Sequence, residues 1–247
     1  MLGRIANRFL RPFGYRLVSE SLDHHPALTD QERDLLESVR PFTMTSVEEM
    51  LAMIDAVRYV EANSVPGAIV ECGVWRGGMM MLAATVLRRL TSSNRELYLY
   101  DAFEGMPPAS KDDVRFDGRT TDEVKANEGV QGAWCQASKD DVTSNMLGTG
   151  YPAEKIHIIE GYVEDTLPDT MPDEIAILRL DTDWYASTRD ELYHLYPRLS
   201  VGGVLIIDDY GYWKGAKKAV DEYFEEVAPT QPLLHRIDHS GRMMIKT

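Results

Sequence analysis

Short apolar runs alternate with longer amphipathic segments along most of this chain. Five runs are rich in branched apolar residues and typical of buried strands: 68–71, 97–101, 156–160, 175–181 and 204–209. Between and after them, apolar residues return at the 3.6-residue spacing of helices over 79–90, 187–199 and 215–227. Apolar strands that alternate with helices predict a mostly parallel sheet with helices on both faces.

Both ends of this pattern carry further elements. Near the start, Ser46 and Glu49 form an S-x-x-E capping box, and apolar residues follow at helical spacing. Near the end, 233–237 and 242–246 have the composition of strands and are separated by a turn at 238–241. Two strands joined by so short a turn run antiparallel, so we expect the last strand to be antiparallel.

An acidic residue ends every one of the five predicted parallel strands. These residues are Glu71, Asp101, Glu160, Asp181 and the pair Asp208 and Asp209. In an open parallel sheet, ligands bind beyond the carboxyl ends of the strands, so we expect the functional site at this edge. The alternative is that each acid only marks where its strand meets water.

Three of these acids suit a divalent cation. Asp181 ends the fourth strand, and Asp208 and Asp209 end the fifth, one helical crossover later. Adjacent parallel strands would bring the three carboxylates to one corner of the sheet. Ligand sets made only of oxygen select hard cations, Mg²⁺ first. We therefore expect a magnesium ion here, which would also offset the repulsion between Asp208 and Asp209.

A glycine-bearing loop, ECGVWRGG, follows the first strand at 71–78. Glycines let the backbone approach a ligand closely, and the start of the next helix favours anionic groups. The loop lacks the G-x-G-x-x-G fingerprint, so a dinucleotide is not expected. Asp101, at the end of the second strand, stands where α/β nucleotide binders hold ribose hydroxyls. Together these features predict a nucleotide-like cofactor.

Composition limits the remaining possibilities. Hydrophobic residues make up 44% and charged residues 27% of the 247 residues, which predicts a proper core in one α/β domain. A net charge of −14 argues against a nucleic-acid partner bound through phosphates. Two cysteines form no disulfide framework, which suits a cytoplasmic protein. No apolar run approaches the roughly 20 residues of a membrane span.

Two segments depart from the general pattern. The arm at 1–40 begins with residues 1–19, which hold four arginines and no acid. We expect this basic stretch either to contact a membrane surface or to pack on the domain or on a second subunit. The segment 105–137 is rich in proline, glycine and charge. A connection this long in a compact domain is often a functional lid, the alternative being a disordered insertion. The domain itself is expected to cover 41–247.

Six motifs of the chain together resemble the macrocin O-methyltransferase family. They are PFTMTSVEEM, PGAIVECGVWRGG, YDAFEGMP, EGYVEDTLP, LRLDTDWYAST and LYPRLSVGGVLIIDDYGYW, in this order. The resemblance spans roughly residues 41–225. It implies a class I methyltransferase fold, a Rossmann-like seven-stranded and mostly parallel sheet with an antiparallel last strand. It also implies S-adenosylmethionine as methyl donor, Mg²⁺ assistance, and a sugar hydroxyl of a natural product or glycan as acceptor.

The resemblance further implies roles for individual residues. The residues that would bind the cofactor are Glu71, Gly73 and Trp75 at its methionine end, Asp101 at its ribose, and Gly161, Val163 and Glu164 at its adenine. The residues that would bind the metal are Asp181, Asp208 and Asp209.

Catalysis needs a base that removes the proton of the acceptor hydroxyl. More distant catechol-type enzymes place a lysine three residues after the first metal-binding acid, and here that position is Trp184. Asp181 or Asp183 is therefore the candidate base. Aromatic residues surround the same corner and suit either stacking on a sugar ring or internal packing: Trp184, Tyr185, Tyr210, Tyr212 and Trp213.

Two other classes of function compete with methyl transfer. The D-x-D pattern at 181–183 is typical of glycosyltransferases that chelate a metal with a nucleotide-sugar, but it explains neither Asp208 and Asp209 nor the ECGVWRGG loop. A non-catalytic partner protein of a glycan assembly is the second alternative. We expect instead a homo-oligomeric O-methyltransferase whose acceptor is a small glycosylated molecule.

Overall fold

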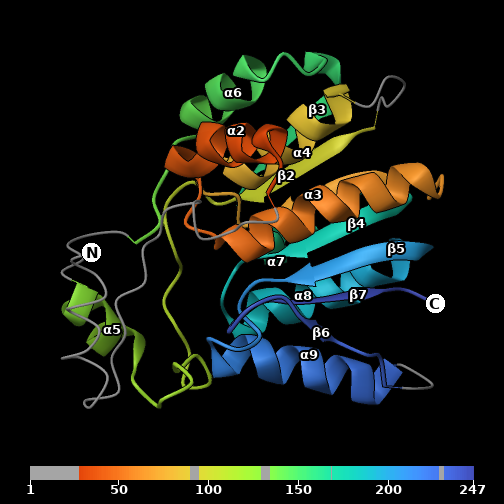
Figure 1. The fold of residues 1–247 in the computed structure, drawn as a ribbon. Coiled ribbons are helices and arrows are strands. Elements are labelled where there is room, and N and C mark those ends of the chain that lie inside the picture. Colours follow the sequence, from red (N-terminus) through yellow and green to blue (C-terminus); the bar gives the residue numbers. More distant parts are fainter. Residues whose placement is uncertain (1–27, 90–94, 129–133, 168, 228–230) are drawn as a thin grey trace, which may run out of the picture.

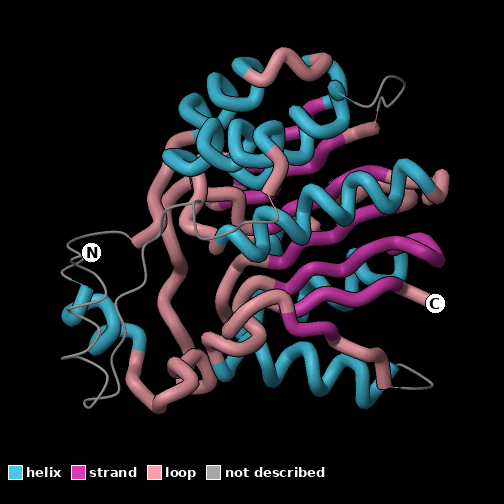
Figure 2. The backbone as a smooth tube through the Cα atoms, viewed as in Figure 1, coloured by secondary structure: helices cyan, strands magenta, loops and turns pink. Residues whose placement is uncertain are grey.

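One mixed sheet of seven strands runs through the computed structural model, which describes residues 28–89, 95–128, 134–167, 169–227 and 231–247 (Figures 1 and 2). The strands are β1 (Ala68–Cys72), β2 (Leu97–Asp101), β3 (Ile156–Glu160), β4 (Ile175–Leu180), β5 (Leu199–Ile207), β6 (His235–Arg236) and β7 (Arg242–Ile245). Their order is β3-β2-β1-β4-β5-β7-β6. The strands β1 to β5 pair in parallel, and β7 pairs antiparallel with both β5 and β6. The predicted fold class is confirmed.

Helices cover both faces of this sheet (Figure 1). The α-helices are α2 (Asp30–Val39), α3 (Val47–Ala62), α4 (Gly78–Arg89), α5 (Thr121–Glu128), α6 (Lys139–Gly148), α7 (Val163–Thr166), α8 (Tyr185–Leu195) and α9 (Lys214–Val227). Short 3₁₀ turns lie at Arg40–Phe42, Ala153–Lys155 and Tyr196–Arg198. Side chains alternate along each strand, so Ile69 enters a core with α2, α3 and α4, and Val70 enters a second core with α7, α8 and α9.

The strand bounds differ from the sequence prediction at β5 and β6. β5 begins at Leu199, and its pairing with β4 shifts register between the Ile175–Leu199 and Ile177–Val204 pairs. The extra residues form a bulge, with Gly202 at a φ of +83°. β6 keeps only two of the residues predicted as a strand. These shifts lie at the ends of the elements and leave the sheet edge with the acidic residues unchanged.

The described residues 28–39 belong to the core of the domain. Thr29 and Glu32 form a capping box that starts α2, and Leu35, Leu36 and Val39 are buried against the face that carries α3 and α4. The basic stretch 1–19 lies outside the described residues, so its contact with a membrane or a second subunit stays a prediction. Within the described ranges, no helix is both long and apolar enough to cross a bilayer.

The 105–137 segment makes several contacts with the domain. Figure 1 shows α5 set apart from the sheet, beyond the carboxyl ends of the strands. Asp113 is buried and accepts a hydrogen bond from the backbone N–H of Tyr185 at 2.7 Å, at the start of α8. A β-bridge joins Arg115 to Trp213, ahead of α9. These contacts hold the segment next to the sheet edge where the acidic residues lie, and its motion as a lid stays a prediction.

Replacing Leu36 tests whether α2 belongs to the core. Leu36→Ala should lower the free energy of unfolding by about 3 kcal/mol, because the side chain is only 1% exposed and its removal leaves a cavity. Urea denaturation of both proteins measures the difference. The control, Leu147→Ala on the half-exposed face of α6, should stay within about 0.5 kcal/mol of the parent. Equal stability for both variants would place α2 outside the core.

Candidate active site

One cavity of about 710 Å³ lies at the carboxyl ends of the parallel strands, within the usual size range of small-molecule sites. Every site residue predicted from the sequence lines it: Glu71, Gly73, Trp75, Asp101, Gly161, Val163, Glu164, Asp181, Asp183, Asp208 and Asp209. The strands β1 and β4 are neighbours in the sheet, and the chain order reverses between them. Such a point is where open α/β sheets bind ligands.

The loop after β1 needs glycine at its first position. Gly73 has a φ of +81°, and a Cβ there would lie 2.0 Å from the carbonyl oxygen of Asp181. Since this contact is with backbone, a side chain would have to push β1 and β4 apart. The loop that is predicted to hold the methionine end of the cofactor therefore touches the start of the acidic corner directly.

Asp101 organises two turns at once. One carboxylate oxygen accepts the backbone N–H of Trp75 at 2.9 Å, and the other accepts that of Phe103 at 2.8 Å. Both donors belong to residues with positive φ, +47° and +56°. Burial raises the pKa of Asp101, and the backbone N–H groups oppose that rise by stabilising the charged form. Asp101, the residue predicted to bind the ribose, thus also fixes the shape of the cavity wall.

The predicted adenine edge follows β3. Gly161 has a φ of +136°, and its N–H donates to the carbonyl oxygen of Asp101 at 3.0 Å. Val163 is buried at the start of α7, while burial raises the pKa of the neighbouring Glu164 carboxyl. An apolar side chain and a carboxyl at the cavity wall suit the face and the polar edge of a purine.

Asp181, Asp208 and Asp209 meet at the corner formed by β4 and β5. Each offers one carboxylate oxygen, and the three atoms lie within 4.8 Å of one another. Burial raises the pKa of Asp181 and of Asp209, and nearby carboxylates add to that rise. Among the described residues, Oδ2 of Asp209 is buried without a hydrogen-bond partner. The arrangement has the oxygen donors and the unpaired atom that a cation would need.

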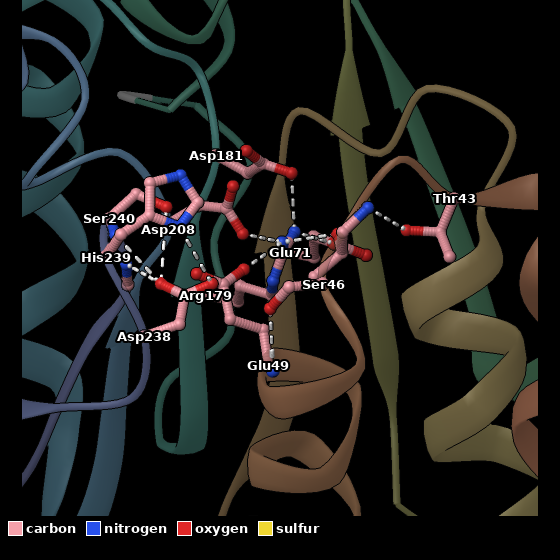
Figure 3. Close-up of polar contacts among 12 residues, drawn as sticks. Thr43, Ser46, Glu49, Glu71, Arg179, Asp181, Asp208, Asp238, His239 and Ser240 are labelled. Atoms are coloured by element: carbon pink, nitrogen blue, oxygen red, sulfur yellow. Dashed lines mark hydrogen bonds and ion pairs between the residues drawn. The ribbon is translucent and has the colours of Figure 1, made fainter. Parts of the chain in front are cut away.

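A buried arginine that the sequence analysis missed lies on the inner side of this corner. Arg179 in β4 is fully buried, and its Nη1 donates to Glu71 at 2.5 Å and to Asp181 at 2.6 Å. Its Nη2 donates to Asp208 and to the hydroxyl of Thr45. Figure 3 shows Glu71, Asp181 and Asp208 around the guanidinium. The available signal was a single arginine inside the apolar run IAILRL, because a buried charge needs partners.

The start of α3 closes the same corner from the other side. Glu49 is buried with its Oε2 3.9 Å from Nη2 of Arg179, and one of its oxygens has no partner among the described residues. Burial, together with the nearby Asp208 carboxyl, raises the pKa of Glu49 to about 12, so it is protonated at neutral pH. The capping box predicted from the sequence is only half formed, since Ser46 caps the helix but Glu49 faces the site.

Two tryptophans of the aromatic cluster are internal packing rather than an open stacking surface. Trp184 and Trp213 are 3% and 1% exposed, with their rings edge to face at 5.0 Å. Nε1 of Trp213 donates to Asp183 at 2.7 Å, and Nε1 of Trp184 donates to the carbonyl oxygen of Pro107 at 3.0 Å. Trp213 also contacts Trp134 edge to face, so the 105–137 segment packs on the residue that orients Asp183.

The sheet order, the antiparallel β7 and the cavity beyond the loop after β1 define a class I methyltransferase. A family model for macrocin O-methyltransferases (TylF) matches residues 20–246. The chain belongs to this family and is an S-adenosylmethionine-dependent O-methyltransferase. The glycosyltransferase alternative is therefore wrong, and so is the non-catalytic one.

Characterised relatives agree with this assignment. The chain is 37% identical over 181 residues to demethyldecarbamoylnovobiocin O-methyltransferase of Streptomyces niveus, covering 73% of this chain and 67% of that one. It is 32% identical over 199 residues to mycinamicin III 3''-O-methyltransferase of Micromonospora griseorubida, covering 81% and 76%. The solved O-methyltransferase NovP shares 33% identity and superposes with a TM-score of 0.72, covering 83% of this chain and 82% of its own.

Asp101 should matter more for the cofactor than the exposed acid next to it. We expect S-adenosylhomocysteine to bind with a Kd on the order of micromolar. Asp101→Ala should weaken binding at least tenfold, since two backbone hydrogen bonds to a charged acceptor are lost along with the predicted ribose contact. Calorimetry measures both values. Glu104→Ala, three residues later and exposed, is the control and should bind normally. Equal affinities would remove Asp101 from the cofactor site.

Proposed function

We propose that this enzyme transfers a methyl group from S-adenosylmethionine to a hydroxyl of a sugar carried by a natural product or glycan. We also propose that a divalent cation, Mg²⁺ first, assists at Asp181, Asp208 and Asp209. Two relatives are named demethyldecarbamoylnovobiocin O-methyltransferase and mycinamicin III 3''-O-methyltransferase. These names support a glycosylated acceptor. The expected homo-oligomer and a cytoplasmic location are part of the same proposal.

The observation that carries the metal proposal is the set of three converging carboxylates. Their oxygens lie within 4.8 Å of one another, and one buried oxygen of Asp209 has no partner among the described residues. An unpaired buried carboxylate oxygen is costly, and a cation that binds there removes the cost. A donor set of oxygen atoms alone suits Mg²⁺ and leaves positions for water and the acceptor. When bound, the cation would lower the pKa of a coordinated hydroxyl.

Residues near the three carboxylates would supply the base and position the cofactor and the acceptor. Asp181 is held by Arg179, which leaves Asp183 as the better candidate base. Burial and the neighbouring Asp181 raise the pKa of Asp183, and the hydrogen bond from Trp213 opposes that rise by stabilising the charged form. The loop at Gly73 touches the carbonyl of Asp181, so the cofactor loop and the acceptor side of the cavity are adjacent. Fixing both partners in one cavity supplies much of the rate acceleration.

The 105–137 segment is proposed to cover the acceptor. Its residues Gly105, Met106, Pro107, Trp134 and Cys135 line the cavity together with the acidic corner. Met106 and Trp134 also pack on a small apolar cluster with Trp184 and Trp213. A lid that rests on this cluster would exclude water from the reacting hydroxyl.

A methyl-transfer screen over glycosylated acceptors tests the function. Transfer should require Mg²⁺ and stop in excess chelator. Asp208→Asn and Asp209→Asn should lower kcat at least 100-fold, because each removes a charged ligand, while S-adenosylhomocysteine binding changes little. Isotope-labelled methyl incorporation measures kcat, and calorimetry measures cofactor binding. Full activity in chelator, or normal turnover by both variants, would contradict the metal proposal. Absence of transfer to every sugar acceptor would contradict the acceptor proposal.

Trp213→Phe tests the role of Asp183. The change keeps most of the ring but removes the N–H that donates to Asp183, so kcat should fall about tenfold with cofactor affinity unchanged. Trp184→Phe removes an equally buried indole N–H whose acceptor is Pro107, and it should lower kcat less. Steady-state kinetics with one acceptor compares the two variants. An equal loss in both would indicate that packing of the cluster, rather than orientation of Asp183, limits turnover.

A further inference from the structure

We propose that Arg179 is a positioning residue for methyl transfer, whose buried guanidinium orients Asp181 and Asp208 so that their remaining oxygens face the cation. This inference depends on the proposed cation site. Arg179 itself touches neither the acceptor nor the cation in this scheme. It acts through the two carboxylates that it holds.

The guanidinium is placed between two groups of acids. Nη1 donates to Oδ2 of Asp181 at 2.6 Å, and Nη2 donates to Oδ1 of Asp208. One oxygen of each carboxylate is thereby occupied on the inner side, and a carboxylate has two. The second oxygen of each carboxylate makes no hydrogen bond to Arg179. Asp209, the third member of the corner, forms no hydrogen bond or ion pair with Arg179 in the described part of the chain and keeps an unpaired oxygen.

The guanidinium is itself held on its far side. Nη1 also donates to Glu71 at 2.5 Å, and Nη2 donates to the hydroxyl of Thr45 at 3.0 Å. Glu71 lies directly opposite Arg179 in the pairing of β1 with β4. Because both terminal nitrogens, Nη1 and Nη2, make contacts, the planar guanidinium cannot rotate without breaking several hydrogen bonds. The orientation of Asp181 and Asp208 is therefore set by β1 and by the residue just ahead of α3.

A lysine cannot reproduce this arrangement. Lysine keeps the positive charge but places its three N–H donors on one nitrogen, so it cannot hold Asp181 and Asp208 at the two separate positions that Nη1 and Nη2 set. A purely structural role would require only that the buried charges be balanced. A positioning role requires the fork, so the two roles predict different outcomes for Arg179→Lys.

Mn²⁺ serves as the probe of the site because it replaces Mg²⁺ and is detected by electron paramagnetic resonance. Arg179→Lys should weaken Mn²⁺ binding by about tenfold or more, in the range seen when residues that orient metal ligands are changed. At saturating Mg²⁺, its kcat should recover most of the parent value, since higher cation concentration compensates weak binding. Thermal unfolding of the same samples reports folding separately.

Two further variants complete the test. Arg95→Lys is the control, because Arg95 likewise makes several hydrogen bonds, in its case to Glu61 and to two backbone carbonyls, but lies outside the cavity. It should lower the melting temperature and leave Mn²⁺ affinity unchanged. Thr45→Val keeps the shape and removes one partner of Nη2, so it should weaken Mn²⁺ binding a few-fold. If Arg179→Lys does not fold, Mn²⁺ binding by the milder Thr45→Val variant tests the same proposal.

The outcomes separate this inference from the proposed function. If the parent protein binds no Mn²⁺ and methylates in chelator, the cation site is absent and the proposed metal assistance fails. If the parent binds Mn²⁺ but the Arg179 and Thr45 variants bind it equally well, the cation site stands and the positioning role is overturned. A kcat for Arg179→Lys that stays low at every Mg²⁺ concentration, with parent-like Mn²⁺ affinity, also overturns it.

Discussion

A single buried guanidinium connects the elements that build this active site. Arg179, the next-to-last residue of β4, binds Glu71 of β1, Asp208 after β5 and Thr45 ahead of α3. A charge removed from water is tolerated only when partners surround it, so these four parts of the chain depend on one another. Removing the guanidinium itself would leave Glu71, Asp181 and Asp208 without the cation that balances them.

A second constraint joins the 105–137 segment to the side of the cavity that we propose holds the acceptor. Asp113 binds the start of α8, and Trp134 packs on Trp213, which donates to Asp183. The cofactor side is arranged differently, because Asp101 pairs with backbone N–H groups of its own loops. Changes in the inserted segment can thus alter the acceptor side while the cofactor loops keep their shape. This separation is suited to a family whose members share a donor and differ in acceptor.

Much of the fold and most of the lining of the candidate site could be predicted from local patterns. The strands at Ile69 and Leu178 have continuous apolar runs, and acids at their ends appear on the expected edge. Elements with weak patterns were missed, such as α6, whose residues alternate little between apolar and polar faces. The early start of β5 was also missed, since a bulge with glycine breaks the period of two. Such elements are stabilised by contacts with distant residues, which no local window contains.

The sequence by itself determined the order of strands and helices, the acidic edge and the family motifs, because each depends on residues close together along the chain. Only the tertiary structure decided what balances the acids. Arg179 and Glu71 are 108 positions apart in the sequence, and Arg179 and Thr45 are 134 apart. The sequence analysis expected a metal to balance these carboxylates, whereas the fold places a guanidinium against two of them, Asp181 and Asp208. Which charges meet is set by strand order and register, and these follow from packing of the whole domain rather than from any segment of it.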